Sequence, residues 1–166
     1  MKFQIFISLI ISILPKKISK DGINLIKKYV KFYPKAYLVP FGDWKIGYGT
    51  TNSDFSITKT KITKDLVINE KTANDWLVKT INKVYAPKIM KINGKYFWNQ
   101  NQFDALCSYL YDSNSLEILT NNAKKTKQQI ANFLLLQSQR KIQNHEDSVK
   151  VKRRKDEYLL FTKKGV

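Results

Sequence analysis

Apolar side chains fall on one helical face in the stretch from residue 19 to residue 30. These apolar positions are Ile23, Ile26, Tyr29 and Val30. Ser19 or Asp21 can cap the start of such a helix. Tyr33-Pro34 must follow its end, because the residue before a proline is disfavoured in the helical conformation. The pattern therefore predicts a short amphipathic helix.

The apolar pattern then changes to every second residue, which is typical of strands. Ala36–Val39 and Trp44–Tyr48 are the two strands that this pattern predicts, and a turn containing proline and glycine separates them. Trp44, Ile46 and Tyr48 alternate to one side of the second strand. The sequence thus predicts a β-hairpin directly after the first helix.

A third strand and a longer helix are expected next. The strand is predicted near Phe55–Thr58. Ile62-Thr63 provides a cap that leads toward a helix running through Glu70 and on to Val84. Pro87 is expected to stop this helix, because a proline inside a helix removes a backbone hydrogen bond.

The second half of the chain has a mostly helical pattern. A turn is predicted at Asn93-Gly94, and helices are predicted at Asn99–Tyr111, Gln128–Gln137 and Arg154–Phe161. The first of these three helices has the best core stripe, formed by Phe103, Leu106, Cys107 and Leu110. This order of elements predicts an α+β fold in which most of the mass is helical.

The 166 residues, 43% of them hydrophobic, suit one compact domain with a short apolar segment before it. We expect that segment at residues 1–18 and the domain at residues 19–166. Phe3–Leu14 is nearly all apolar but shorter than the roughly 20 residues needed to span a bilayer. It fits a secretion signal, an uncleaved membrane anchor or a helix packed on the domain. An exported, periplasmic or virion-associated location is accordingly expected.

The formal net charge of +17 points to a polyanionic neighbour. Nucleic acid, anionic lipid and an acidic wall polymer all have the required charge. Only Arg140, Arg153 and Arg154 are arginines, which argues against a surface built to recognise bases or phosphates in a bidentate manner. Nucleic acid is therefore the less favoured partner.

Metal and cysteine chemistry find little support in the sequence. Cys107 is the only cysteine and His145 the only histidine, so neither an intrachain disulfide nor a zinc-ligand pattern is possible. Cys107 lies in an apolar helical stretch and His145 in a polar one, which disfavours a Cys/His catalyst. No cofactor and no metal are expected.

Five segments, in register, resemble the phage-type lysozymes (endolysins) of glycoside hydrolase family 24. They are Gly22–Tyr29, Lys35–Tyr37, Gly42–Gly49, Asn101–Leu106 and Arg153–Glu157. The resemblance covers nearly the whole chain from Ser19 to Gly165. It implies a small β-hairpin lobe and a larger helical lobe, with a cleft between them that binds the glycan strands of peptidoglycan.

The resemblance also implies where catalytic residues would be. In this family a glutamate ends the first helix as the general acid, and an aspartate and a threonine follow on the hairpin. Here those positions hold Val30, Val39 and Lys45, and the position of a common histidine holds Thr50. Glycoside hydrolysis needs a pair of carboxyl groups. Lys45 also adds a cation where a cationic sugar would need stabilising. The catalytic set is thus expected to be replaced.

Other residues remain candidates for the cleft. Asp43 and Asp54 lie on the hairpin side, whereas Asp21 would be about 13 Å from the Val30 position along the helix. Trp44 and Tyr48 are candidates for stacking on sugars. Three roles remain open for such a protein. It is expected either to bind peptidoglycan or an acidic wall polymer, or to serve as a phage or virus particle component, and the alternative is a divergent active endolysin.

Overall fold

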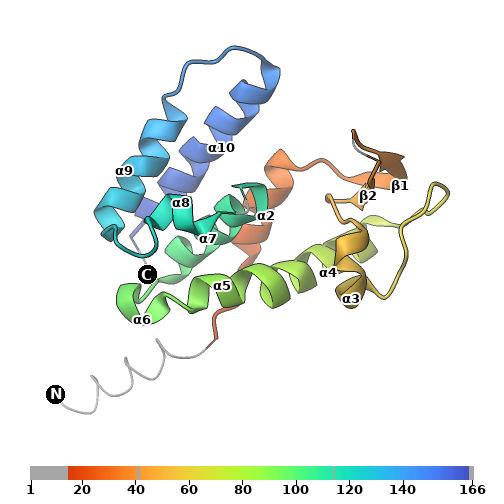
Figure 1. The fold of residues 1–166 in the computed structure, drawn as a ribbon, viewed down its shortest axis with the longest axis horizontal. Coiled ribbons are helices and arrows are strands. Elements are labelled where there is room, and N and C mark those ends of the chain that lie inside the picture. The colour runs from red at the N-terminus through yellow and green to blue at the C-terminus, as the bar shows by residue number, and fades with distance from the viewer. Residues whose placement is uncertain (1–14, 41, 114, 165–166) are drawn as a thin grey trace.

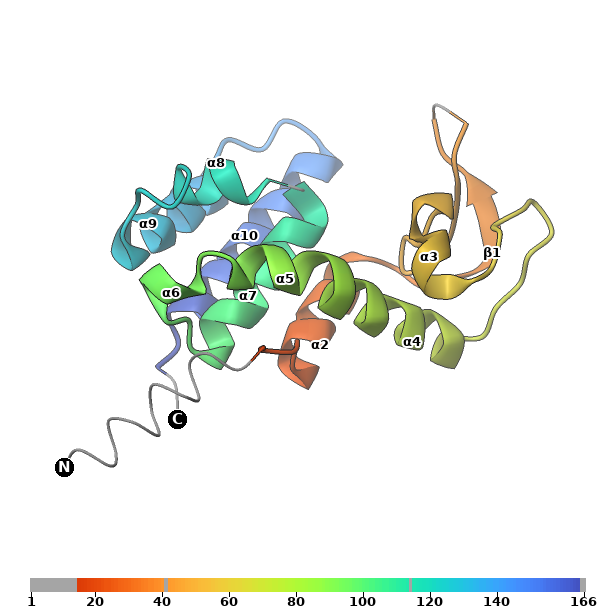
Figure 2. The same cartoon turned by 60° about the horizontal axis from the view of Figure 1, so that its bottom comes forward.

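Two lobes of unequal size make up the protein in this computed structural model, which describes residues 15–40, 42–113 and 115–164. Figure 2 shows β1 and α3 at one end, the helices from α6 to α10 at the other, and α4 running between them. The elements, in chain order, are α2 (Lys20–Tyr29), β1 (Tyr33–Leu38), β2 (Trp44–Gly47), the 3-10 turn η1 (Asn52–Asp54), α3 (Phe55–Thr58), α4 (Glu70–Thr80), the π-helical turn η2 (Ile81–Tyr85), α5 (Ala86–Met90), α6 (Asn93–Tyr96), α7 (Gln100–Ser113), α8 (Leu116–Thr120), α9 (Lys127–Ser138) and α10 (His145–Thr162). The expected α+β fold, with a small hairpin lobe and a larger helical lobe, is confirmed.

The hairpin of the small lobe is antiparallel, as predicted. Tyr37 pairs with Lys45 and Leu38 with Trp44, while the register is irregular between Tyr33 and Tyr37. Strand β1 begins at Tyr33, three residues earlier than the pattern indicated. A separate small core lies beneath the hairpin and contains Ala36, Ile46, Ile62 and Trp76.

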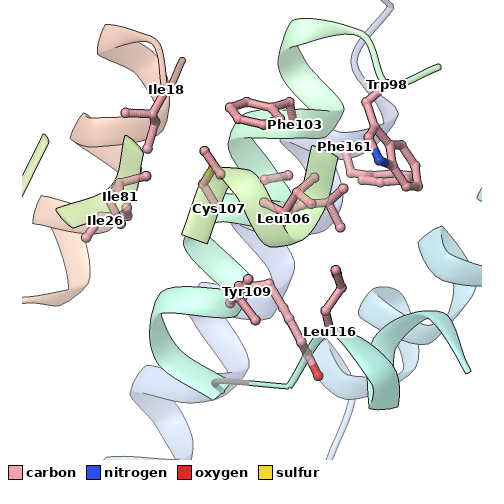
Figure 3. Close-up of a cluster of buried hydrophobic side chains, with 14 of the residues drawn as sticks. Ile18, Ile26, Ile81, Trp98, Phe103, Leu106, Cys107, Tyr109, Leu116 and Phe161 are labelled. Atoms are coloured by element: carbon pink, nitrogen blue, oxygen red, sulfur yellow. The ribbon is translucent and has the colours of Figure 1, made fainter. Parts of the chain in front are cut away.

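Helix α7 forms the centre of the large lobe, with α2 and α10 packed against it (Figure 1). Every residue from Phe103 to Leu110 is buried, whereas the predicted apolar stripe covers only one side of the helix. The burial is complete because other elements pack against α7 on several sides. The core side chains come from segments far apart in the sequence, as Figure 3 shows for Ile18, Ile26, Ile81, Trp98, Phe103, Leu106, Cys107 and Phe161. The buried thiol of Cys107 is one of these core groups, and burial raises its pKa well above the usual value.

The prediction of a strand at Phe55–Thr58 is wrong, since these residues form the short helix α3. The Asp54 carboxylate accepts the backbone N–H of Thr51 at 2.9 Å and starts a helical turn before Phe55. Lys59, in the left-handed conformation, then ends it. Local capping overrides the apolar alternation of this segment.

Pro87 does not stop the long helix either. The chain passes from α4 through the π-helical turn η2 and into α5, where Pro87 lies in the first turn. A π-turn shifts the hydrogen-bond register by one residue, and proline is tolerated in the first turn of a helix. Asn93-Gly94 likewise belongs to a short helix, α6, and not to a simple turn.

The last helix is longer than predicted, because α10 already begins at His145. Its first half is polar and has no apolar stripe, so periodicity could not reveal it. Asn144 caps it by accepting the backbone N–H of Asp147 at 2.9 Å. The apolar segment 3–14, proposed as a signal, anchor or packed helix, lies outside the described residues. Among the helices that are described, none is long and apolar enough to cross a membrane.

Candidate functional site

A pocket of about 420 Å³ lies where the two lobes meet, and we call it the interlobe pocket. Both lobes supply its walls, together with the helix that joins them. The lining residues are Val30, Tyr37, Lys45, Tyr48, Gly49, Thr51, Ser53, Asp54, Thr80, Tyr85, Tyr111, Asp112 and Arg153. Its volume falls within the range of sites that hold small ligands.

Val30 forms part of the wall at the end of α2. It is the C-cap residue of that helix, and its N–H donates to the Ile26 carbonyl at 3.0 Å. The side chain is half-buried and packs against the main core. From the hairpin, Lys45 enters the same pocket opposite Tyr37 in the strand ladder. An apolar group and a cation thus stand at two of the positions that the sequence singled out.

The carboxylates of the pocket, Asp54 and Asp112, are both engaged by protein groups. Asp54 accepts the Thr51 amide and lies near the phenols of Tyr85 and Tyr111. Burial raises the pKa of both phenols, and the negative charge of Asp54 raises them further. Asp112 forms ion pairs with Arg153, at 3.4 Å, and with the next arginine in the sequence.

A buried ion-pair network holds Arg153 in place at the back of the pocket. Glu157 is fully buried and accepts hydrogen bonds from Arg153 Nε at 3.1 Å, from the Ser108 hydroxyl at 2.7 Å and from Arg154. Removing one member of such a network would leave buried charge uncompensated. These residues therefore have a structural role.

Thr80 is the one lining side chain that is both buried and unpaired, as far as the described residues go. It is 5% exposed, and its hydroxyl has no hydrogen-bond partner there. Buried hydroxyls in native proteins nearly always have a partner, either in the protein or in water or a ligand. Thr80 lines the interlobe pocket, but its hydroxyl oxygen exposes less than 1 Å² of surface, so a group in the pocket does not reach this oxygen in the present conformation.

Tyr48 connects the pocket to the surface of α4. Its hydroxyl donates to Glu70, and Lys27 Nζ lies 4.7 Å from the centre of its ring. Its backbone carbonyl accepts the hydroxyl of Tyr111. This arrangement fixes the ring as a wall of the pocket while its hydroxyl is already occupied.

The structure brings only part of the sequence-predicted set together. Val30, Lys45, Tyr48 and Asp54 line the interlobe pocket. Among the described residues, the lining does not include Val39, Asp43, Trp44 or Thr50.

Each of these four residues is placed elsewhere in the small lobe. Val39 donates its N–H to the Asp43 carbonyl at 2.9 Å in the hairpin turn. Trp44 packs on the small core, and Thr50 is buried with its N–H bonded to the Ile46 carbonyl at 3.0 Å.

Sequence reasoning did not identify Thr80, Tyr85 and Tyr111 as pocket residues. All three lie on helical segments, and the pattern of apolar positions gave no reason to single them out. Which side of a helix faces a second lobe depends on the packing of the two lobes.

Comparison with known proteins places the chain among lysozyme-like proteins. The phage lysozyme family profile matches residues 27–157. An endolysin of Acyrthosiphon pisum secondary endosymbiont phage 1 is 33% identical over 95 residues, a match that spans 57% of this chain and 58% of the endolysin.

Solved structures share the fold at low sequence identity. The muramidase domain of SpmX from Asticaccaulis excentricus superposes with a TM-score of 0.64 at 23% identity, covering 89% of this chain and 99% of that domain. A variant of P22 lysozyme superposes with a TM-score of 0.64 at 23% identity, covering 88% of this chain and 98% of that lysozyme. An endolysin from Escherichia coli O157:H7 phage FAHEc1 superposes with a TM-score of 0.62 at 22% identity, covering 89% of this chain and 94% of that endolysin.

Proposed function

Since this chain belongs to the phage lysozyme family, we propose that it binds the glycan strands of peptidoglycan in the interlobe pocket without hydrolysing them. The observation that carries the proposal is Val30 at the end of α2, lining the pocket where the family resemblance implies a general acid. A valine cannot supply a proton to a leaving oxygen.

The remaining carboxylates support loss of hydrolysis. Glycosidases use two carboxyl groups on either side of the bond, one of them protonated. A carboxylic acid that protonates a leaving group usually has an apolar surrounding that raises its pKa. Asp54 accepts a backbone amide, and Asp112 is paired with two guanidinium groups. Lys45 adds positive charge to the same pocket, which opposes the positive charge that develops on the sugar.

The other lining groups favour retained binding. Tyrosine rings offer flat apolar faces, and the exposed hydroxyl of Ser53, which shares a hydrogen bond of 2.6 Å with the Thr51 hydroxyl, can also bond to a sugar hydroxyl. The net charge of +17 favours association with an anionic cell wall, including any acidic wall polymer.

Two assays on the full chain test the proposal. Purified peptidoglycan should show no release of reducing ends above the buffer level. Co-sedimentation with purified sacculi should be measurable at low ionic strength, and added salt should weaken its electrostatic part.

A blocking variant tests whether binding uses the pocket. Ser53 is an exposed lining residue, so Ser53→Trp should fill the pocket and reduce sacculus binding by about fivefold or more without touching the core. Ser56→Trp, on the exposed part of α3 outside the pocket lining, is the matched control. Equal binding by both variants would place the binding surface elsewhere. No sacculus binding at all, with stable co-purification in phage particles, would replace the proposal with a structural role.

The second candidate function is an active peptidoglycan glycosidase. The observation that favours it is the carboxylate of Asp54, which lines the pocket. If the wild-type chain releases reducing ends, Asp54→Asn should abolish that activity. Asp43→Asn, at an exposed position outside the lining, should leave it unchanged.

A further inference from the structure

A second pocket, of about 380 Å³, lies in the large lobe between α9 and α10, and we call it the α9–α10 pocket. The two helices run side by side in Figure 1, and the loop that joins them supplies Arg140, Lys141 and Gln143 to the lining. Tyr109 of α7 and Ile118 of α8 contribute to its lining. It shares no described lining residue with the interlobe pocket, so it is a separate site.

Positive charge converges on this pocket from two directions. Arg140 and Lys141 come from the loop after α9, while Lys150 and Arg154 lie one turn apart on α10. Asp147 is the one carboxylate among the described lining residues. A concave site with an excess of one sign of charge concentrates ions of the opposite sign.

The protein uses only part of this positive charge. Arg154 is paired with Asp112 and Glu157, and Lys150 is paired with Glu146 at 2.6 Å. By contrast, Arg140 and Lys141 have no carboxylate partner among the described residues. Arg140 donates to the neutral side chain of Gln137 at 3.1 Å, and no hydrogen bond or ion pair is found there for the Lys141 ammonium group.

The Asp147 carboxylate does not neutralise them. Asp147 accepts the backbone N–H of Gln143 at 3.2 Å and so helps to hold the loop against the start of α10. The loop that carries Arg140 and Lys141 is therefore fastened to the helix that carries Lys150. Less side-chain and loop ordering is then needed when a ligand binds.

Apolar groups complete the walls and limit the size of the ligand. Phe133 and Val151 line the pocket, and the guanidinium carbon of Arg154 lies 4.4 Å from the centre of the Tyr109 ring. We infer that the α9–α10 pocket binds a phosphate group carried on a small polyol or sugar. Guanidinium and ammonium donors arriving from different directions match the tetrahedrally arranged oxygens of a phosphate better than the coplanar oxygens of a carboxylate. Such a group is found both on free sugar phosphates and in the repeating units of phosphodiester wall polymers.

Amide chemical shifts of the isotope-labelled full chain test the inference directly. Glycerol 3-phosphate, titrated at a fixed ionic strength of about 0.15 M, should give saturable shifts confined to the loop after α9 and the first turns of α10. Inorganic phosphate and a short poly(glycerol phosphate) are titrated in the same way as the second and third probes. Tighter binding of the polymer would identify a phosphodiester chain as the source, and tighter binding of glycerol 3-phosphate would identify the free ester. Saturable binding of inorganic phosphate alone would overturn the requirement for a polyol body.

A pair of charge-matched variants provides the control. Arg140→Ala with Lys141→Ala should weaken binding about tenfold, the loss expected for removing charge-assisted hydrogen bonds. Lys124→Ala with Lys155→Ala removes the same charge from exposed positions outside the pocket lining and should change binding less than about twofold. Equal weakening by both pairs, or no saturable shift with any of the three probes, would overturn the inference. The site is independent of the interlobe pocket, so failed sacculus binding does not affect this result.

Discussion

Asp104 of α7 accepts hydrogen bonds from both the backbone N–H and the hydroxyl of Ser19, the residue that caps α2. The two residues are 85 positions apart in the sequence, and the distance from the Ser19 nitrogen to Asp104 Oδ1 is 2.9 Å. Burial raises the pKa of the Asp104 carboxyl, an effect that the hydrogen bonds from Ser19 and Gln100 oppose. This contact fixes the start of α2 on the core helix and thereby positions Val30 at its other end.

Breaking this contact should destabilise the fold. Asp104→Ala is expected to lower the free energy of unfolding by about 1–3 kcal/mol, because it leaves the Ser19 donors without their acceptor. In a double-mutant cycle with Ser19→Ala, the coupling energy should be about 1 kcal/mol or more. Urea unfolding of the four proteins measures it, and purely additive losses would contradict a direct interaction.

Gly47 should not tolerate a side chain. Its φ is +63°, and a Cβ there would lie 2.9 Å from the Ala73 Cβ and 3.2 Å from Ile68 Cδ1. Gly47→Ala is therefore expected to cost about 2–4 kcal/mol, combining backbone strain with overpacking between the hairpin and α4. Gly42→Ala separates the two effects, because φ is +89° there but, among the described residues beyond its chain neighbours, no atom lies within 4 Å of an added Cβ. It should cost only about 1–2 kcal/mol by thermal unfolding. Equal losses for the two variants would contradict the close approach at Gly47.

Asp156 should make stability depend on pH on the acid side. Burial acts to raise its pKa, but hydrogen bonds from Lys28 and Tyr29 outweigh burial and bring it below the usual value of 3.8. The unfolded chain then binds this proton at a higher pH than the folded chain does. The stabilisation is therefore present above a pH of about 3.8 and is lost as the pH falls through the lower folded value.

The corresponding variant is Asp156→Asn, since it removes the charge without changing the size of the side chain. It should be about 0.5–1 kcal/mol less stable near neutral pH, a small value because the side chain is partly exposed. That deficit should shrink as the pH drops below about 3.8 in urea unfolding. Asp75→Asn, on the exposed side of α4, is the control that should show no such change. A deficit that is constant at every pH would exclude the electrostatic explanation.

A variant of Thr80 tests whether its buried hydroxyl takes part in ligand binding or only in folding. Thr80→Val keeps the shape of the side chain and removes a buried hydroxyl that has no partner among the described residues. Stability should be unchanged or slightly higher, because no protein hydrogen bond is lost. Because the hydroxyl oxygen exposes less than 1 Å² of surface, a glycan in the pocket does not reach it in this conformation, and affinity for sacculi should change less than about twofold. A loss of affinity of about fivefold or more with unchanged stability would instead show that the pocket opens to this hydroxyl when a glycan binds.

Restoring the family residues tests the loss of catalysis. Val30→Glu with Val39→Asp and Lys45→Thr should generate only weak release of reducing ends from peptidoglycan, because Val39 does not line the pocket and its aspartate would lie outside it. The glutamate would lie beside the core at the end of α2, in a setting that favours a raised pKa. Val30→Gln in the same background is the matched control and should be inactive. Activity of the glutamine variant would show that the acid is supplied from elsewhere.

The periodicity of the sequence predicted several elements correctly, and local chemistry explains where it failed. The first helix, the hairpin and the buried helix α7 all follow apolar patterns that their own packing requires. Phe55–Thr58 became a helix because the Asp54 carboxylate caps the turn before it. Pro87 lies within a continuing helical path because the π-turn changes the hydrogen-bond register just before it. Each failure depends on one hydrogen bond or one register shift that a hydrophobic pattern does not contain.

By itself, the sequence determined the resemblance to phage-type lysozymes and placed Val30 and Lys45 at positions of chemical interest. Motifs and spacing are properties of the chain, so they can be read without coordinates. Only the tertiary structure decided that Thr80 and Tyr111 share a pocket with Val30, whereas Val39 does not. The physical reason is that a pocket wall is defined by how two lobes pack, and that packing depends on long-range contacts such as the bond between Ser19 and Asp104.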